Sequence, residues 1–413
     1  MATLTKIVNS IHERDYTHSL TEQLLLTQAT TQLGISKFEL RLLDFFNSYC
    51  IFGFSFGVHP QIHRAWKNEI PRLFMHSELV RNSVLSYASL NLFPLCDLEY
   101  VFSQDESMSK IKFNSNVESI YKGKVGLIDD GEDDAQENIY IKASNYFSDT
   151  LMMKNQLLAK QKEIFYGPSF IEVGPATELF VSSVLIFSFL ALHPHKLVPL
   201  VSFNEDEHEP DFLSICKGIR QTIVAYSAAI TNSPFGLLFI FDTGKKVPSI
   251  KECSYPLIVS LIRDLNAEFD NKDLTSTSTH EYQVLRETIE VLHECMYKAT
   301  SFGYPVPVFR WILIIPHEFR QLVYQKNFFA LRLIYVFASL CSMTRFQLFR
   351  DSNMWVDYME WYKSYNFKLY NGAWKYSLDD RLYYLAEIKS FRFGLLQRLD
   401  LSDFDPEFLA QVV

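Results

Sequence analysis

Residues 281–299 read EYQVLRETIEVLHECMYKA, and this stretch decides the fold class. Its apolar positions recur at alternating steps of three and four residues: Tyr282, Leu285, Ile289, Leu292, Met296 and Ala299. Steps of this size place the side chains along one face of an α-helix, whereas a half-buried strand alternates at every second position. The stretch therefore predicts a helix that buries one face.

The same helical period returns in most of the patterned segments. Helical stripes are carried by Phe38, Leu42, Phe45 and Tyr49; by Val80, Val84 and Tyr87; by Phe212, Ile215, Ile219, Ile223, Tyr226 and Ile230; by residues 319–324 and 329–340; and by Leu382, Leu385, Ile388, Leu395 and Leu399. Strand-like alternation is scarce, and only 14 glycines punctuate the chain. These patterns predict an all-α fold, built as stacked antiparallel helix pairs that form one large helical domain.

The domain is predicted to start at residue 36. Ser36 is followed three residues later by Glu39, which is the spacing of a capping box at the first turn of a helix. Residues 1–35 are rich in Thr and Gln and are expected to be a leader or linker, so that 36–413 form the domain. Residues 101–136 are a polar insert that ends in an acidic cluster, and we expect this insert to be solvated and mobile.

The most apolar run is LFVSSVLIFSFLAL at residues 179–192. It is shorter than the roughly 20 residues that a membrane-spanning helix needs, and it contains three serines. We interpret it as a buried core helix and expect no transmembrane segment. The six cysteines form no C-x-x-C pair and stand in apolar contexts, which is typical of free cysteines in a reducing compartment.

The net charge of −9 argues against direct DNA binding by this chain, because domains that hold nucleic acid are usually basic. Motifs for nucleotide binding, for a serine nucleophile or for a zinc protease are absent. His193-Pro194-His195 and His208 fix no third metal ligand, and His293-Glu294 is expected on a helix surface. We therefore predict no enzyme, no catalytic residue, no metal and no cofactor.

A series of short pieces gives a resemblance to a known family. They run from about Glu39 to about Tyr362, and their order and spacing carry the likeness more than any single piece does. The pieces are Glu39 to Phe46; Trp66 and Ile70-Pro71; His76 to Leu79 with Ala88-Ser89-Leu90; Tyr140 and Phe147-Ser148; Ala176 to Ile186; Pro199-Leu200 and Lys217-Gly218-Ile219; Ser233-Pro234 and Gly236 to Leu238; Trp311, Pro316, Phe319, Leu322 and Ala330-Leu331; and Trp355.

In this order the chain resembles the fungal-specific regulatory domain that follows binuclear zinc-cluster DNA-binding modules, in the branch of the sterol uptake control regulators. The resemblance implies a helical domain of a fungal transcription regulator that forms a homodimer, contacts the transcription machinery or regulatory proteins, and works in the nucleus, with shuttling from the cytoplasm. Its sterol-sensing members hold a sterol in an apolar pocket. The family's zinc-cluster cysteines are absent from this sequence.

Two stripes are the candidate ligand contacts if a sterol or other lipid binds. The first is Phe180, Val184 and Phe187 in the apolar run, and the second is Leu333, Phe337 and Leu340 in a later helix. Each set has helical spacing, and both lie where the resemblance places the most apolar helices. The alternative interpretation is that both stripes are plain core. At the level of function, the alternatives are a protein-interaction scaffold that has no zinc cluster and binds no small molecule, and an enzyme of unrecognised type.

Overall fold

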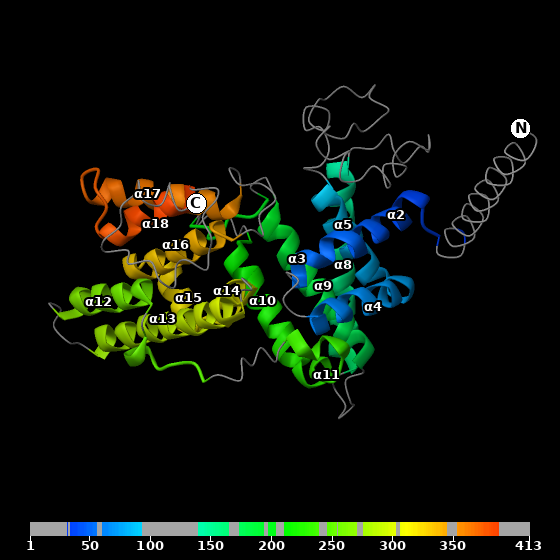
Figure 1. Ribbon diagram of the computed structural model, residues 1–413, viewed down its shortest axis with the longest axis horizontal. Coiled ribbons are helices and arrows are strands. Elements are labelled where there is room, and N and C mark those ends of the chain that lie inside the picture. Colours follow the sequence, from blue (N-terminus) through cyan, green and yellow to red (C-terminus); the bar gives the residue numbers. More distant parts are fainter. Residues whose placement is uncertain are drawn as a thin grey trace, which may run out of the picture. The chain divides into compact units, whose positions relative to one another are not determined.

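The computed structural model describes residues 31, 34–55, 60–92, 139–164, 173–193, 197–203, 210–238, 246–253, 255–270, 276–302, 306–344 and 353–387. Every regular element in these ranges is a helix, and they contain no strand (Figure 1). The predicted all-α class is confirmed. The described part of the chain divides into two compact units, one formed by residues 1–51 and 67–160 and the other by residues 52–66 and 161–413.

In the first unit, α2 (Lys37–Phe45) begins with the predicted capping box. The Ser36 hydroxyl accepts a hydrogen bond from the Glu39 amide at 3.1 Å, and the Glu39 carboxylate accepts one from the Ser36 amide at 2.7 Å. The Tyr146 hydroxyl of α8 (Ile139–Ile164) also donates to Glu39, at 2.8 Å. Helix α2 packs on α5 (Glu78–Leu92) and continues into the π-helical turn η1 (Phe46–Cys50).

The second unit contains most of the helices. Those toward its C-terminal end pack in successive pairs, α12 on α13, α13 on α14 and α16 on α17. The bounds are α9 (Val173–Leu192), α10 (Phe212–Ala225), α11 (Ser227–Thr231), η5 (Pro234–Leu238), η6 (Ile250–Glu252), α12 (Pro256–Asp270), α13 (Ser276–Phe302), α14 (Val306–Ile314), α15 (His317–Tyr324), α16 (Phe328–Ser342), α17 (Met354–Leu369) and α18 (Ser377–Glu387). The short α3 (Ile51–Ser55) and α4 (Pro60–His76) carry the chain between the two units.

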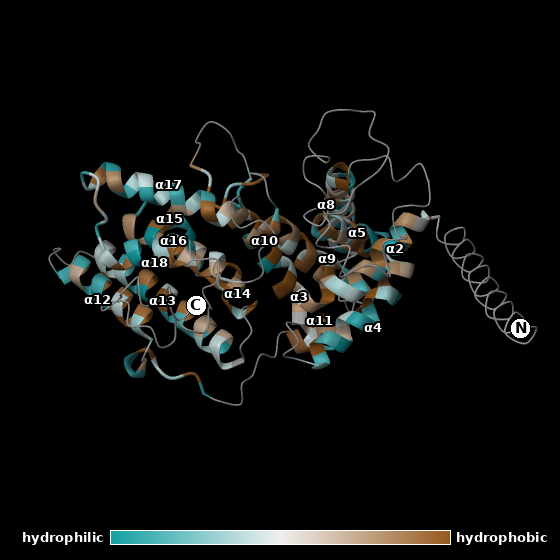
Figure 2. Cartoon of the chain, turned by 45° about the horizontal axis from the view of Figure 1, so that its top comes forward, coloured by the Kyte–Doolittle hydropathy of each residue, from teal (hydrophilic) through white to brown (hydrophobic). Residues whose placement is uncertain are grey.

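Helix α9 is an apolar helix whose residues are mostly buried. It starts at Val173, six residues before the apolar run, because Pro175 falls in the first turn, where a proline is tolerated. With 20 residues it is long and apolar enough to cross a membrane, but 83% of its apolar window is buried inside the protein. Its buried residues lie on every side of the helix, as in a fully enclosed core helix, and Figure 2 colours the helices around the α9 label mainly as hydrophobic. The interpretation as a core helix therefore holds.

Some expectations need correction or lie outside the described residues. His293 is not on a helix surface: it is 3% exposed, and its ring meets Tyr255 edge-on. Burial lowers its pKa, against the pull of Glu290 and Glu294. Residues 1–30 of the predicted leader 1–35, the acidic insert 101–136, His195 and His208 lie outside the described residues. The single domain from residue 36 and the antiparallel pairing remain predictions.

Candidate functional site

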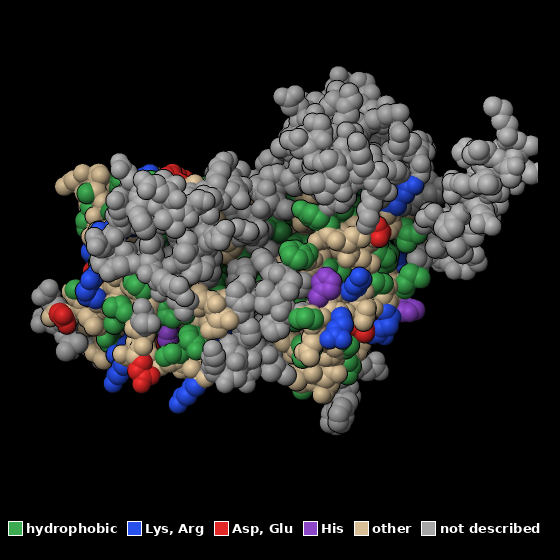
Figure 3. Space-filling view, in the orientation of Figure 1, with side chains coloured by type: hydrophobic (Ala, Val, Ile, Leu, Met, Phe, Trp, Pro, Cys, Tyr) green, Lys and Arg blue, Asp and Glu red, His purple; other side chains and the backbone are tan. Residues whose placement is uncertain are grey.

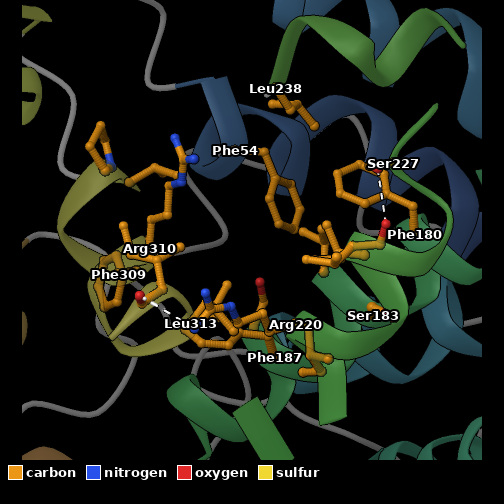
Figure 4. Close-up of a pocket in the computed structure, with 18 of the residues that line it drawn as sticks. Phe54, Phe180, Ser183, Phe187, Arg220, Ser227, Leu238, Phe309, Arg310 and Leu313 are labelled. Carbon is orange, nitrogen blue, oxygen red and sulfur yellow. Dashed lines mark hydrogen bonds between the residues drawn. The ribbon is translucent and has the colours of Figure 1, made fainter. Parts of the chain in front are cut away.

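The second unit contains a cavity of about 380 Å³. Its walls come from α9, α10 and α14, with contributions from α3, α4, α11 and η5 (Figure 4). The lining is mostly apolar and aromatic: Phe54, Trp66, Phe180, Ser183, Val184, Phe187, Ser188, Ile219, Arg220, Ile223, Val224, Ser227, Leu238, Val306, Pro307, Phe309, Arg310, Leu313 and Ile314. Its volume lies within the range of small-molecule sites, about 300–1,000 Å³.

One face of α9 forms a wall of the cavity. Phe180, Val184 and Phe187, the first predicted stripe, all line it. Phe187 packs against Phe212 at 5.1 Å between ring centroids and against Phe309 at 6.5 Å. These contacts hold the Phe187 ring in place at the cavity.

An aromatic group from distant parts of the sequence closes another side. Phe54 and Trp66 stack with 4.4 Å between ring centroids, and Trp66 meets Phe235 edge-on at 5.3 Å. Phe180 lies 6.2 Å from the same Phe235 ring. The wall is thus built of interlocked aromatic rings, which supply a large apolar surface.

The mouth of the cavity lies at the end of α10 and the start of α11. Val224 is 63% exposed and Ser227 is also exposed, although both line the cavity. The Ser227 hydroxyl donates to the carbonyl of Val224 at 2.9 Å, and the Ser183 hydroxyl donates to the carbonyl of Leu179 at 2.5 Å. The hydroxyl of each serine thus already donates a hydrogen bond to a backbone carbonyl three or four residues earlier in the chain.

Two arginines are the charged groups of the described lining, and their situations differ. Arg220 donates through Nη1 to the carbonyls of Ile315, at 2.9 Å, and Ile314, at 3.4 Å. These carbonyls end α14, where a helix carries partial negative charge. Figure 4 shows the Arg220 guanidinium beside Leu313, on the α14 side of the cavity. Arg220 therefore serves as a cap for α14.

Arg310 lies half-buried on α14 and, within the described residues, caps no helix end. Among the described residues it makes no hydrogen bond and no ion pair, and none of the lining residues is acidic. Burial raises the pKa of the nearby Cys295 thiol to about 12, although the charge of Arg310 opposes this rise. The thiol is therefore neutral at physiological pH and does not balance the guanidinium.

The second predicted stripe lies elsewhere. Leu333, Phe337 and Leu340 are fully buried in α16, and none of them lines the cavity. The Phe337 ring lies 4.7 Å from Trp311 and 5.5 Å from Trp355. The structure thus brings the α9 stripe to the cavity and places the α16 stripe in the core.

The residues that sequence reasoning missed are those that only tertiary contacts bring to the cavity. Phe54 and Trp66 lie more than a hundred residues before α9, and no local pattern links them to it. Arg310 did leave a signal, because it is the one charged residue in VPVFRWILI, residues 306–314. A lone charge in an apolar helix needs a partner or a function.

A second cluster of ionisable groups is fully enclosed. Arg332 donates through Nε to the Asp379 carboxylate at 2.8 Å and through Nη2 to Asp264 at 2.8 Å, and Arg332 and Asp379 are both 0% exposed. Burial raises the pKa of Asp379, while Arg332 opposes this. The Tyr335 hydroxyl donates to the backbone carbonyl of Asp379 at 2.6 Å. No described cavity reaches the pair, so it acts as a structural tie among α12, α16 and α18.

The described residues contain no group of three or more His, Cys, Asp or Glu side chains that could hold a metal ion. His193, the first histidine of His193-Pro194-His195, is buried against Phe189 with 5.4 Å between ring centroids. No known family model, no curated protein and no solved structure matches the chain. The function must therefore be argued from the cavity and from the sequence resemblance.

Proposed function

We propose that this chain is the ligand-sensing regulatory domain of a fungal transcription regulator and that a lipid occupies the cavity of the second unit. The cavity carries the proposal: it is concave, apolar and aromatic, and it contains few polar groups, as small-molecule sites do. The resemblance to zinc-cluster regulators supports the regulatory role. It also supports homodimer formation, a nuclear location and contacts with regulatory proteins as parts of the same proposal.

The size of the cavity restricts the ligand. A methylene group takes up about as much space as a water molecule, about 30 Å³, so roughly a dozen such groups fit into the cavity's 380 Å³. A whole sterol is larger and would enter only in part or after the walls move apart. A medium-length aliphatic chain fits the cavity as it stands.

The position of the cavity gives the ligand a route to a regulatory effect. A lipid seated in the cavity contacts α9, α10 and α14 at once. It therefore stabilises the arrangement of these three helices that best fits it, and its binding energy shifts the population toward that arrangement. A partner protein that recognises the same arrangement would then respond to the lipid.

The test compares lipid carried over during expression in the native chain and in a variant with a blocked cavity. The purified chain is extracted with organic solvent, and bound lipid is quantified by mass spectrometry. We expect a stoichiometric lipid from the native chain and none from Val184→Trp, which fills the cavity. Val259→Trp, on an exposed position of α12, is the matched control and should keep the lipid.

The outcome separates this function from its main alternative. If the native chain carries no lipid and Val184→Trp behaves as Val259→Trp does in folding and in partner binding, the cavity has no ligand. The chain would then act as a protein-interaction scaffold without a small molecule.

A further inference from the structure

The cavity combines an apolar wall with a cation that has no described partner. Arg310 stands on α14 among Pro307, Phe309 and Leu313, all of which line the same cavity. Placing a guanidinium beside apolar surface costs free energy unless hydrogen bonds or an opposite charge compensate it. Figure 4 shows the Arg310 side chain extending from α14 on the side of the cavity nearer Phe54, away from the α14 end that Arg220 caps.

Three other polar side chains of the wall already have protein partners, whereas the buried Trp66 Nε1 has none among the described residues. The Arg220 guanidinium donates to the carbonyls that end α14, and the hydroxyls of Ser183 and Ser227 donate to backbone carbonyls. Arg310 is therefore the cation of the described lining that makes no hydrogen bond, and its planar fork of donors suits a carboxylate or another planar anion.

Within the described ranges, the charge of Arg310 also has no opposite charge paired with it. The guanidinium of Arg332 is held by two carboxylates, and that of Arg320 donates to the carbonyls of Ile315 and Ile312 at 2.9 and 3.0 Å. A cation retained only for folding would be expected to have comparable partners. Arg310 instead borders an apolar space with a volume of about 380 Å³.

We propose that the cavity selects an amphipathic anion, an aliphatic chain of about ten to twelve carbon atoms that ends in a carboxylate. The chain lies along Phe180, Val184 and Phe187, and the carboxylate pairs with Arg310. This inference rests on the proposed function, because it specifies the ligand of the same cavity. It differs from a sterol in that the headgroup is charged.

The experiment uses two probes that differ in headgroup charge. Dodecanoate and dodecanol are titrated below their aggregation limits into the full chain, and dissociation constants are measured by calorimetry at neutral pH. A charged hydrogen-bonded pair discriminates by roughly tenfold to a hundredfold in affinity, so we expect dodecanoate to bind tighter than dodecanol by this factor.

Variants assign the preference to one side chain. Arg310→Gln should abolish it by weakening dodecanoate alone, and Arg310→Lys should keep part of it, because the charge remains. Arg263→Gln removes an arginine that is 68% exposed on α12, and it should leave both constants unchanged. Dodecanol binding by each variant reports that the cavity is still folded.

Each failure has a distinct meaning. Equal affinities of the native chain for the two probes would overturn the anion selectivity and leave the proposed function standing. A preference that persists in Arg310→Gln would overturn the assignment to Arg310. If the native chain binds neither probe, the proposed function and this inference are overturned together.

Discussion

At the scale of the residue, arginines in similar sequence contexts have different structural roles. Arg220 and Arg320 hold carbonyls around the end of α14, and Arg332 is enclosed by two carboxylates. Only their tertiary contacts distinguish these structural cations from Arg310, whose guanidinium makes no hydrogen bond among the described residues. Mutation of the enclosed pair is therefore expected to lower the free energy of unfolding, whereas mutation of Arg310 is expected to change ligand binding.

Removing one partner of the enclosed pair should be costly. Asp379→Ala leaves Arg332 with Asp264 alone in a site that excludes water, and breaking a buried pair in this way costs about 3–5 kcal/mol of unfolding free energy. The neighbouring Asp380 is exposed, so Asp380→Ala should cost less than about 1 kcal/mol. Urea unfolding of the two variants measures the difference. Equal losses would show that the pair contributes little.

A buried lysine predicts the pH dependence of stability. Burial lowers the pKa of Lys154 to about 8. Between that pH and its ordinary pKa the unfolded chain binds the extra proton, so the stability of the native chain rises with pH. Below about pH 8 the cost of the buried charge is fully present, at most about 3 kcal/mol.

Replacing that lysine should therefore stabilise the protein at neutral pH. We expect Lys154→Met to raise the unfolding free energy at pH 7, with a gain that shrinks as pH rises from 8 toward 10. Lys160 is exposed on the same helix, and Lys160→Met should change little at any pH. Denaturant unfolding across this range tests it, and a gain that does not vary with pH would contradict the assignment.

At the scale of the element, local patterns predict helices well where the signals are local. The capping box at Ser36 and the stripe from Leu285 to Ala299 lie as predicted, because both depend on contacts within a few residues. One predicted helix was too long, and another helix was not predicted. The stripe from Phe212 to Ile230 breaks at Tyr226 into α10 and α11, and α14 forms where no helical stripe was predicted. Pro307 is accommodated in its first turn.

Missing α14 meant missing part of the site, since this helix carries Phe309 and Arg310. The stripe on α9 was found because its period is local. Which of two apolar stripes faces a cavity depends on the neighbours that each helix meets, and the sequence of either helix alone does not specify those neighbours.

The two stripes should respond differently to truncation. Phe337→Ala removes a ring packed between Trp311 and Trp355 and should cost about 3–5 kcal/mol of unfolding free energy. Phe187→Ala should cost less without ligand, because its ring already borders a cavity. It should also reduce the rise in melting temperature caused by dodecanoate. Thermal melts with and without dodecanoate measure both effects, and a ligand effect lost in Phe337→Ala alone would place the ligand elsewhere.

At the scale of the whole molecule, the cavity depends on the path of the chain. Residues 52–66 belong to the second compact unit although the residues before and after them belong to the first. This excursion supplies Phe54 and Trp66 to the cavity wall. Sequence periodicity describes single helices. It therefore cannot predict that a short segment leaves one unit, packs in the other and returns.

The net charge is a property at this same scale, and it predicts how the chain meets DNA. At −9 the chain as a whole repels a phosphate backbone. Figure 3 shows acidic and basic side chains on the described surface of one face, with hydrophobic side chains between them. We expect no sequence-specific binding of duplex DNA at physiological salt, where specific binders reach dissociation constants of about 10⁻⁸ M or lower.

Fluorescence anisotropy with labelled duplexes measures this. Residual binding at low salt should be independent of sequence and should weaken steeply as salt rises, because contacts to phosphates release counterions. A duplex of scrambled sequence and equal length is the control. A nanomolar complex with one sequence, not shared by its scrambled partner, would show that the fold gathers a local basic surface that the net charge conceals, and the regulatory role would then include direct DNA recognition.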